Sequence, residues 1–162
     1  MPNRIDPHRA LVASTALSMD GMNTRHLPGT GAGIDACAAA VQLVLRSVFG
    51  HPFVGGGGNP IWVPDLRAGL LAGGWRAFDD ATGALAGDVG IQNGTHDGTA
   101  DNPYENHVGI VVMDPEGSGE LKILSNSSSR GAFIYVDDLE FSHIGYPPGK
   151  MGPTRFYRYK PS

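Results

Sequence analysis

Helix-type segments occupy the first half of the chain, and strand-type segments occupy the second half. Residues 8–19 follow an Asp-Pro pair, which is a helix-start signal, and residues 36–49 lie between Asp35 as N-cap and Gly50 as the terminating glycine. Residues 64–72 predict a third, short helix. Helices followed by strands predict an α+β fold, with the N-terminal helices packed on one side of a central antiparallel sheet.

The second half of the chain contains short runs of strand-forming residues, separated by turn sequences such as Asn93-Gly94. These runs predict a sheet of about five to six strands. They cover residues 75–78, 88–92, 107–113, 121–124, 132–136 and 154–159. Because the 162 residues include no linker-like segment, we expect residues 1–162 to form a single domain, with its core at about 8–136 and a C-terminal strand at 154–159.

Composition and charge exclude several classes of function. Charged residues make up 17% of the chain, the formal net charge is -4, and neither sign forms a long run, so no nucleic-acid partner is expected. No apolar run reaches the ~18 residues that a membrane span needs, and residues 1–9 lack the apolar region of a signal peptide. If the protein acts outside the cytoplasm, we expect another route to deliver it.

Cys37 is the only cysteine, which excludes an internal disulfide and leaves three roles: core residue, metal ligand or nucleophile. It falls in the first turn of the helix predicted at 36–49, where unpaired backbone N–H groups and the helix dipole stabilise a thiolate. This placement suits a nucleophile. The alternative is that Cys37 is one more small buried residue in the alanine-rich stretch 36–40.

His107 opens an apolar run after a polar segment, a position where a rigid strand is able to hold a general base. One strand later, Asn126 is the predicted third catalytic residue, because its side-chain oxygen is able to accept the imidazole N–H. Ser125 is the alternative, since neighbours along a strand point to opposite faces and only one of them fits the role. The competing interpretations are a surface histidine at a strand end and an ordinary turn asparagine.

Several features together resemble the NlpC-type and CHAP-type cell-wall cysteine peptidases. They are a cysteine near a helix start, the pair Gly87-Asp88 opening a strand, the run His-Val-Gly-Ile-Val-Val from His107, and a polar residue one strand later. The resemblance covers about residues 8–136 and implies a papain-like fold. It also implies cleavage of peptidoglycan stem peptides or cross-bridges through a thioester. In the NlpC-type pattern an Asp directly precedes the Cys, whereas Asp35 lies two residues before Cys37.

The resemblance implies catalytic roles for Cys37, His107 and Asn126. Substrate contacts are expected from four further residues around the helix start, the Gly-Asp pair and the walls of the cleft: Asp35, Trp62, Asp88 and Tyr104. No metal or other cofactor is expected, since the chain has no His-Glu-x-x-His pair and the acidic segment 97–105 lacks the glycine of an EF-hand loop.

The expected function is therefore hydrolysis of a peptide or amide bond in the bacterial cell wall, with a muropeptide as substrate. Made without a signal peptide, the protein is expected to reach the cell wall or periplasm by phage-type release or specialised export. The sequence leaves open which bond is cut and whether an immunity or delivery partner exists. The alternative function is a non-catalytic cell-wall-binding or phage structural module that keeps the same fold.

Overall fold

The computed structural model describes residues 6–27, 36–94, 102–127, 130–141 and 151–160. In these ranges the helices are α1 (Pro7–Ser18), α2 (Cys37–Phe49) and α3 (Val63–Ala72), and a short 3-10 turn, η1, covers Ala81–Gly83. None of the helices in the described ranges is long and apolar enough to cross a membrane.

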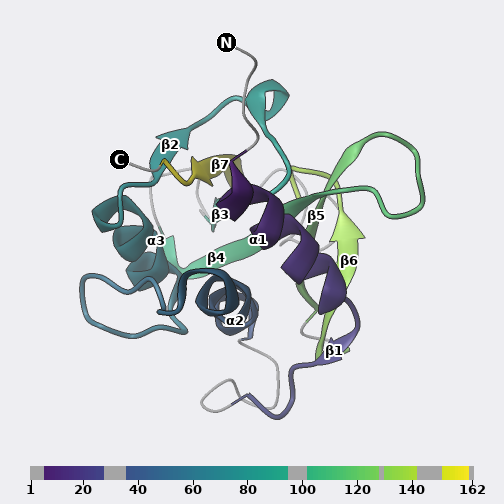
Figure 1. Cartoon of the computed structure of the whole chain (residues 1–162). Coiled ribbons are helices and arrows are strands. Elements are labelled where there is room, and N and C mark those ends of the chain that lie inside the picture. The colour runs from purple at the N-terminus through teal and green to yellow at the C-terminus, as the bar shows by residue number, and fades with distance from the viewer. Residues whose placement is uncertain (1–5, 28–35, 95–101, 128–129, 142–150, 161–162) are drawn as a thin grey trace.

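One antiparallel sheet of seven strands has the order β1-β6-β5-β4-β3-β7-β2 (Figure 1). The strands are β1 (Met22–Asn23), β2 (Arg76–Phe78), β3 (Val89–Gly94), β4 (Asn102–Met113), β5 (Leu121–Ser127), β6 (Ala132–Asp137) and β7 (Met151–Arg158). The prediction of an α+β fold built from helices and an antiparallel sheet is confirmed.

Local sequence signals explain where the helices begin and end. The Asp6 side chain accepts a hydrogen bond of 2.9 Å from the His8 N–H, which caps α1. α2 ends at Gly50, whose φ of 81° is available to glycine at little cost. At its start, α2 differs from the prediction, because Ala36 takes the N-cap position and makes no side-chain cap bond. Asp35, the predicted cap, lies outside the described residues.

The strand count of the sheet is higher than the five to six that the sequence predicts. The additional strand is β1, which lies in a segment rich in Gly, Asn and Thr that reads as a loop. Met22 pairs with Phe133 of β6, so this two-residue strand forms through a long-range contact rather than through its own composition. Tertiary pairing overrides local propensity here.

The sheet separates two apolar layers. Helices α1 and α2 lie over the side that we call the helix face (Figure 1). There Val108, Ile110 and Leu124 pack with side chains of α1, α2 and α3. On the opposite side, the loop face, Val111 and Ile123 pack with a smaller set that includes Ala84, Phe141 and Phe156. Because successive residues of a strand alternate between the two faces, each polar residue of β4 and β5 can be assigned to one of them.

Candidate active site

Cys37 is the first residue of α2, in the first turn as predicted, and its side chain is partly buried. It packs against the apolar cluster on the helix face of the sheet. Ala36 has no side chain able to cap the first turn. The start of α2 therefore presents backbone N–H groups and the positive end of the helix dipole, both of which favour a thiolate over a thiol.

His107 lies on β4, opposite Gln92 of β3. Its Nε2 atom is 3.0 Å from the hydroxyl oxygen of Ser125, and its ring meets the Phe141 ring edge-on, with the ring centroids 4.9 Å apart. Ser125 is completely buried. Since Phe141 belongs to the cluster on the loop face, the contacts with Ser125 and Phe141 place the imidazole of His107 on that face.

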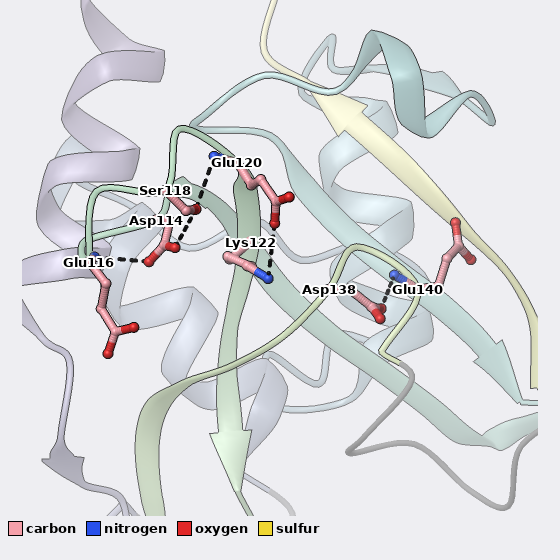
Figure 2. A network of polar contacts seen from close by, with 7 residues as sticks. All are labelled: Asp114, Glu116, Ser118, Glu120, Lys122, Asp138 and Glu140. Atoms are coloured by element: carbon pink, nitrogen blue, oxygen red, sulfur yellow. Dashed lines mark hydrogen bonds and ion pairs between the residues drawn. The ribbon is translucent and has the colours of Figure 1, made fainter.

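A network of polar contacts holds the connection between β4 and β5 (Figure 2). The Asp114 carboxylate accepts hydrogen bonds from the Glu116 N–H and the Ser118 hydroxyl, which closes the turn. The Asp114 N–H also donates to the carbonyl oxygen of Glu120 at 2.9 Å. Beyond this turn the strands pair so that Gly109 is opposite Ser125, on the face that His107 also occupies.

Asn126 points to the other face of β5. Its Oδ1 atom accepts a hydrogen bond of 2.6 Å from the Thr24 hydroxyl, and both residues are buried. Asn126 is also paired across the strands with Phe133, which belongs to the helix-face cluster. Of the two residues that the sequence offers as the orienter of His107, the structure places Ser125 beside the imidazole and binds the Asn126 oxygen to Thr24.

Cys37 and His107 lie on different sides of the sheet. Cys37 packs against the helix-face cluster, whereas the His107 ring contacts Phe141 of the loop-face cluster. The alternation along β4 agrees with this arrangement, because Val108 and Ile110 face the helices and His107 therefore faces away from them. The structure brings His107 together with Ser125, and it does not bring the His107 ring to the face against which Cys37 packs.

Asp88 has a structural role, which corrects the expectation that it contacts substrate. Its side chain is completely buried, and it accepts two hydrogen bonds from Arg158, at 2.9 and 2.7 Å, and one from the Leu85 N–H at 2.8 Å. The hydrogen bond to Asp88 raises the pKa of Arg158 above its ordinary value, with burial opposing the shift. No oxygen of Asp88 is exposed for a ligand, because both are buried and bonded.

The structure describes less of the environment of the other three residues predicted to contact substrate. Trp62 lies at the N-cap of α3 and is 38% exposed, so its ring is accessible, and its role stays a prediction. Asp35 lies outside the described residues. The backbone of Tyr104 belongs to β4, but its side chain also falls outside what the structure describes.

Two polar residues of the loop face were missed by the sequence interpretation. Gln92 and Thr154 are direct cross-strand partners, and Gln92 is also the partner of His107. Both are almost completely buried. The signal was present in the sequence, since Gln92 follows the apolar start of the strand at Val89–Ile91, and a polar residue inside a buried strand needs a partner.

The described residues contain no group of three or more His, Cys, Asp or Glu side chains arranged to hold a metal ion. Comparison with known proteins gives no family: no protein-family model, no curated protein and no solved structure matches the chain.

Proposed function

We propose that this chain is a papain-like cysteine hydrolase that cleaves a peptide or amide bond of bacterial peptidoglycan. The observation that carries the proposal is the position of its only cysteine, Cys37, as the first residue of α2. Its partial burial leaves the thiol in reach of a substrate while the helix start stabilises the thiolate. The resemblance of the sequence to cell-wall cysteine peptidases supplies the substrate class.

The proposed reaction has two steps. The Cys37 thiolate attacks the carbonyl carbon of the amide, forming a C–S bond and an oxyanion that is stabilised by backbone N–H groups of the first turn of α2. Collapse of this intermediate breaks the C–N bond, and the amine leaves with a proton from the general acid. Water then attacks the thioester, which releases the carboxylic acid and restores the thiol.

His107 is the proposed base, and this role requires a specific position of its ring. The imidazole must accept the thiol proton of Cys37, which requires the two groups within hydrogen-bond reach. In the structure the ring instead contacts Ser125 and Phe141 on the loop face. Cys37 as nucleophile and His107 as base are therefore tested in separate variants. The assignment of Cys37 stands even if that of His107 fails.

A second candidate function is favoured by the same separation. A non-catalytic cell-wall-binding or phage structural module does not need Cys37 and His107 on one side of the sheet, whereas a hydrolase using this pair does. In such a module Cys37 is a small core residue, as its packing against the helix-face cluster also allows.

Digestion of purified muropeptides, followed by mass spectrometry of the products, tests the proposed function. The proposal predicts a mass gain of one water per cut, and complete loss of cleavage in Cys37→Ala. His107→Asn is expected to lose cleavage as well. The control His51→Asn is expected to keep it, because His51 is exposed and its contacts among the described residues are to the neighbouring Pro52 carbonyl and Phe53 ring. Cleavage by the Cys37→Ala protein contradicts the proposal, and intact substrates with wild-type protein favour the binding module.

A further inference from the structure

A row of polar side chains crosses the loop face at the edge of its apolar cluster. Ser125, His107, Gln92 and Thr154 belong to four adjacent strands, β5, β4, β3 and β7. Gln92 is paired with His107 on one side and with Thr154 on the other. Cross-strand partners on one face have Cβ atoms about 5 Å apart, so these side chains are neighbours.

Two adjacent members of this row have a buried polar atom without a partner. The Gln92 Nε2 atom donates to the carbonyl oxygen of Glu140 at 3.0 Å, which identifies Oε1 as the remaining acceptor. Among the described residues, neither Gln92 Oε1 nor Thr154 Oγ1 has a hydrogen-bond partner, although the two residues are only 5% and 1% exposed. Buried polar groups are normally bonded, so a pair of neighbouring exceptions indicates a place for a ligand.

A short segment of described chain covers the row. The Gln92 side chain bonds to the Glu140 backbone, the Thr154 N–H donates to the Glu140 carboxylate at 3.3 Å, and the Phe141 ring lies against His107. Phe141 has a φ of 55°, which an L-residue with a bulky side chain rarely adopts. The cover is thus held by two polar contacts and by the Phe141 side chain, which is buried in the loop-face cluster, and a ligand reaches the row only when this segment moves.

We propose that this row binds a neutral amide group. An amide offers one N–H donor, which fits the Gln92 Oε1 acceptor, and one carbonyl oxygen, which fits the Thr154 hydroxyl as donor. A charged ligand is disfavoured, because the two atoms without a partner belong to neutral side chains and burying an unpaired charge is costly. The Glu140 carboxylate beside the Thr154 N–H further disfavours an anion. The proposal goes beyond the hydrolase function and does not depend on Cys37, which packs on the other face.

The test uses the Cys37→Ala protein, so that no probe is consumed, and the blocked alanine N-acetylalanine methylamide as the probe. Methyl and imidazole NMR signals of Thr154 and His107 are followed as the probe is added. We expect saturable shifts of both residues and at least a five-fold weaker affinity in the additional variant Thr154→Val, which keeps the shape and removes the hydroxyl.

Thr24→Val is the matched control, since Thr24 is a buried threonine on the other face whose hydroxyl is bonded to Asn126. The affinity of the Thr24→Val variant for the probe is expected to equal that of the Cys37→Ala protein. Equal affinity in Thr154→Val overturns the proposal, as does an absence of shifts up to the solubility of the probe. A crystal soaked with the probe that shows only a water between Gln92 and Thr154 overturns it too. If the Cys37→Ala protein loses cleavage and still binds the probe, the amide site is separate from the hydrolase function.

Discussion

The imidazole of His107 is fixed by Ser125 rather than by Asn126: Nε2 of His107 lies 3.0 Å from the Ser125 hydroxyl, and the Asn126 oxygen accepts from Thr24. We expect Ser125→Ala to change the ¹⁵N chemical shifts of the His107 ring, because the hydrogen bond at Nε2 sets the tautomer. In Asn126→Ala those shifts stay as in the wild type. The stability of that variant falls by about 1–3 kcal/mol, since the Thr24 hydroxyl is left buried without its acceptor. If Asn126→Ala changes the ring shifts of His107 and Ser125→Ala leaves them unchanged, Ser125 is not the partner of His107.

The ion pair of Asp88 and Arg158 is expected to stabilise the fold. Replacing Arg158 by Ala leaves a buried carboxylate whose remaining donor among the described residues is the Leu85 N–H, and we expect a loss of about 2–3 kcal/mol in urea unfolding. The loss is below that of a fully buried pair, because Arg158 is partly exposed. Arg155→Ala is the control: its bond to Asp79 joins two exposed side chains and is worth about 0–1 kcal/mol. Equal losses in the two variants contradict the structural role of Asp88.

This ion pair also has a defined pH dependence. The pKa of Arg158 is raised above its ordinary value by the hydrogen bond to Asp88. A group whose pKa is higher in the folded state contributes its full stability below the unfolded pKa, and the contribution is lost as the pH rises through the raised pKa. The difference in unfolding free energy between wild type and Arg158→Ala should therefore stay constant from pH 6 to pH 9.

The glycine of the His-Val-Gly-Ile run has a packing role in this structure. A Cβ atom on Gly109 meets the Leu124 carbonyl oxygen at 2.7 Å and Ile123 Cγ1 at 2.9 Å. We expect Gly109→Ala to lose about 1–3 kcal/mol of stability, measured by thermal or urea unfolding. Gly83→Ala is the control, since the nearest atom to its added Cβ is 3.9 Å away. An unchanged Gly109→Ala protein contradicts the close approach of β4 and β5.

The glycine-rich segment 55–58 is anchored to α3. The Asp65 carboxylate, which is buried, accepts hydrogen bonds from the N–H groups of Gly57 at 3.1 Å and Asn59 at 2.8 Å. In Asp65→Ala both donors lose a charged acceptor, and we expect a loss of about 2–4 kcal/mol together with faster proteolysis within this segment. Asp80→Asn, at an exposed position, should leave the proteolysis rate unchanged. If the Asp65→Ala protein resists proteolysis as well as the wild type does, Asp65 does not anchor this segment.

The three helices could be predicted from the sequence because their signals are local. The Asp-Pro start of α1 and the glycine after α2 act within one turn of the chain. Two-residue β1 could not be predicted, because it forms by pairing with β6, more than a hundred residues away. The buried partner of Asp88 could not be predicted for the same reason, since Arg158 is brought to it by the pairing of β3 with β7.

The position of His107 relative to the helices could not be predicted from its own strand, because Val108, Ile110 and Val111 are all apolar and both faces of the strand are buried. In the structure Val108 and Ile110 are the residues that pack against the helices, so His107 has the opposite orientation. The identity of its hydrogen-bond partner was not predictable, because Ser125 and Asn126 are both polar and only the register of β4 with β5 distinguishes them. That register depends on the turn closed by Asp114.

The activation of Cys37 is the central claim, and the rate of its alkylation by iodoacetamide as a function of pH tests it most directly. Because Cys37 is the only cysteine, the mass of the intact protein reports modification at this residue alone. We predict that the folded protein is alkylated with a half-maximal rate well below pH 8.5, about the ordinary pKa of a free thiol. A profile centred at or above that value, or no reaction until the protein is unfolded by urea, contradicts the claim and makes Cys37 an inert core residue.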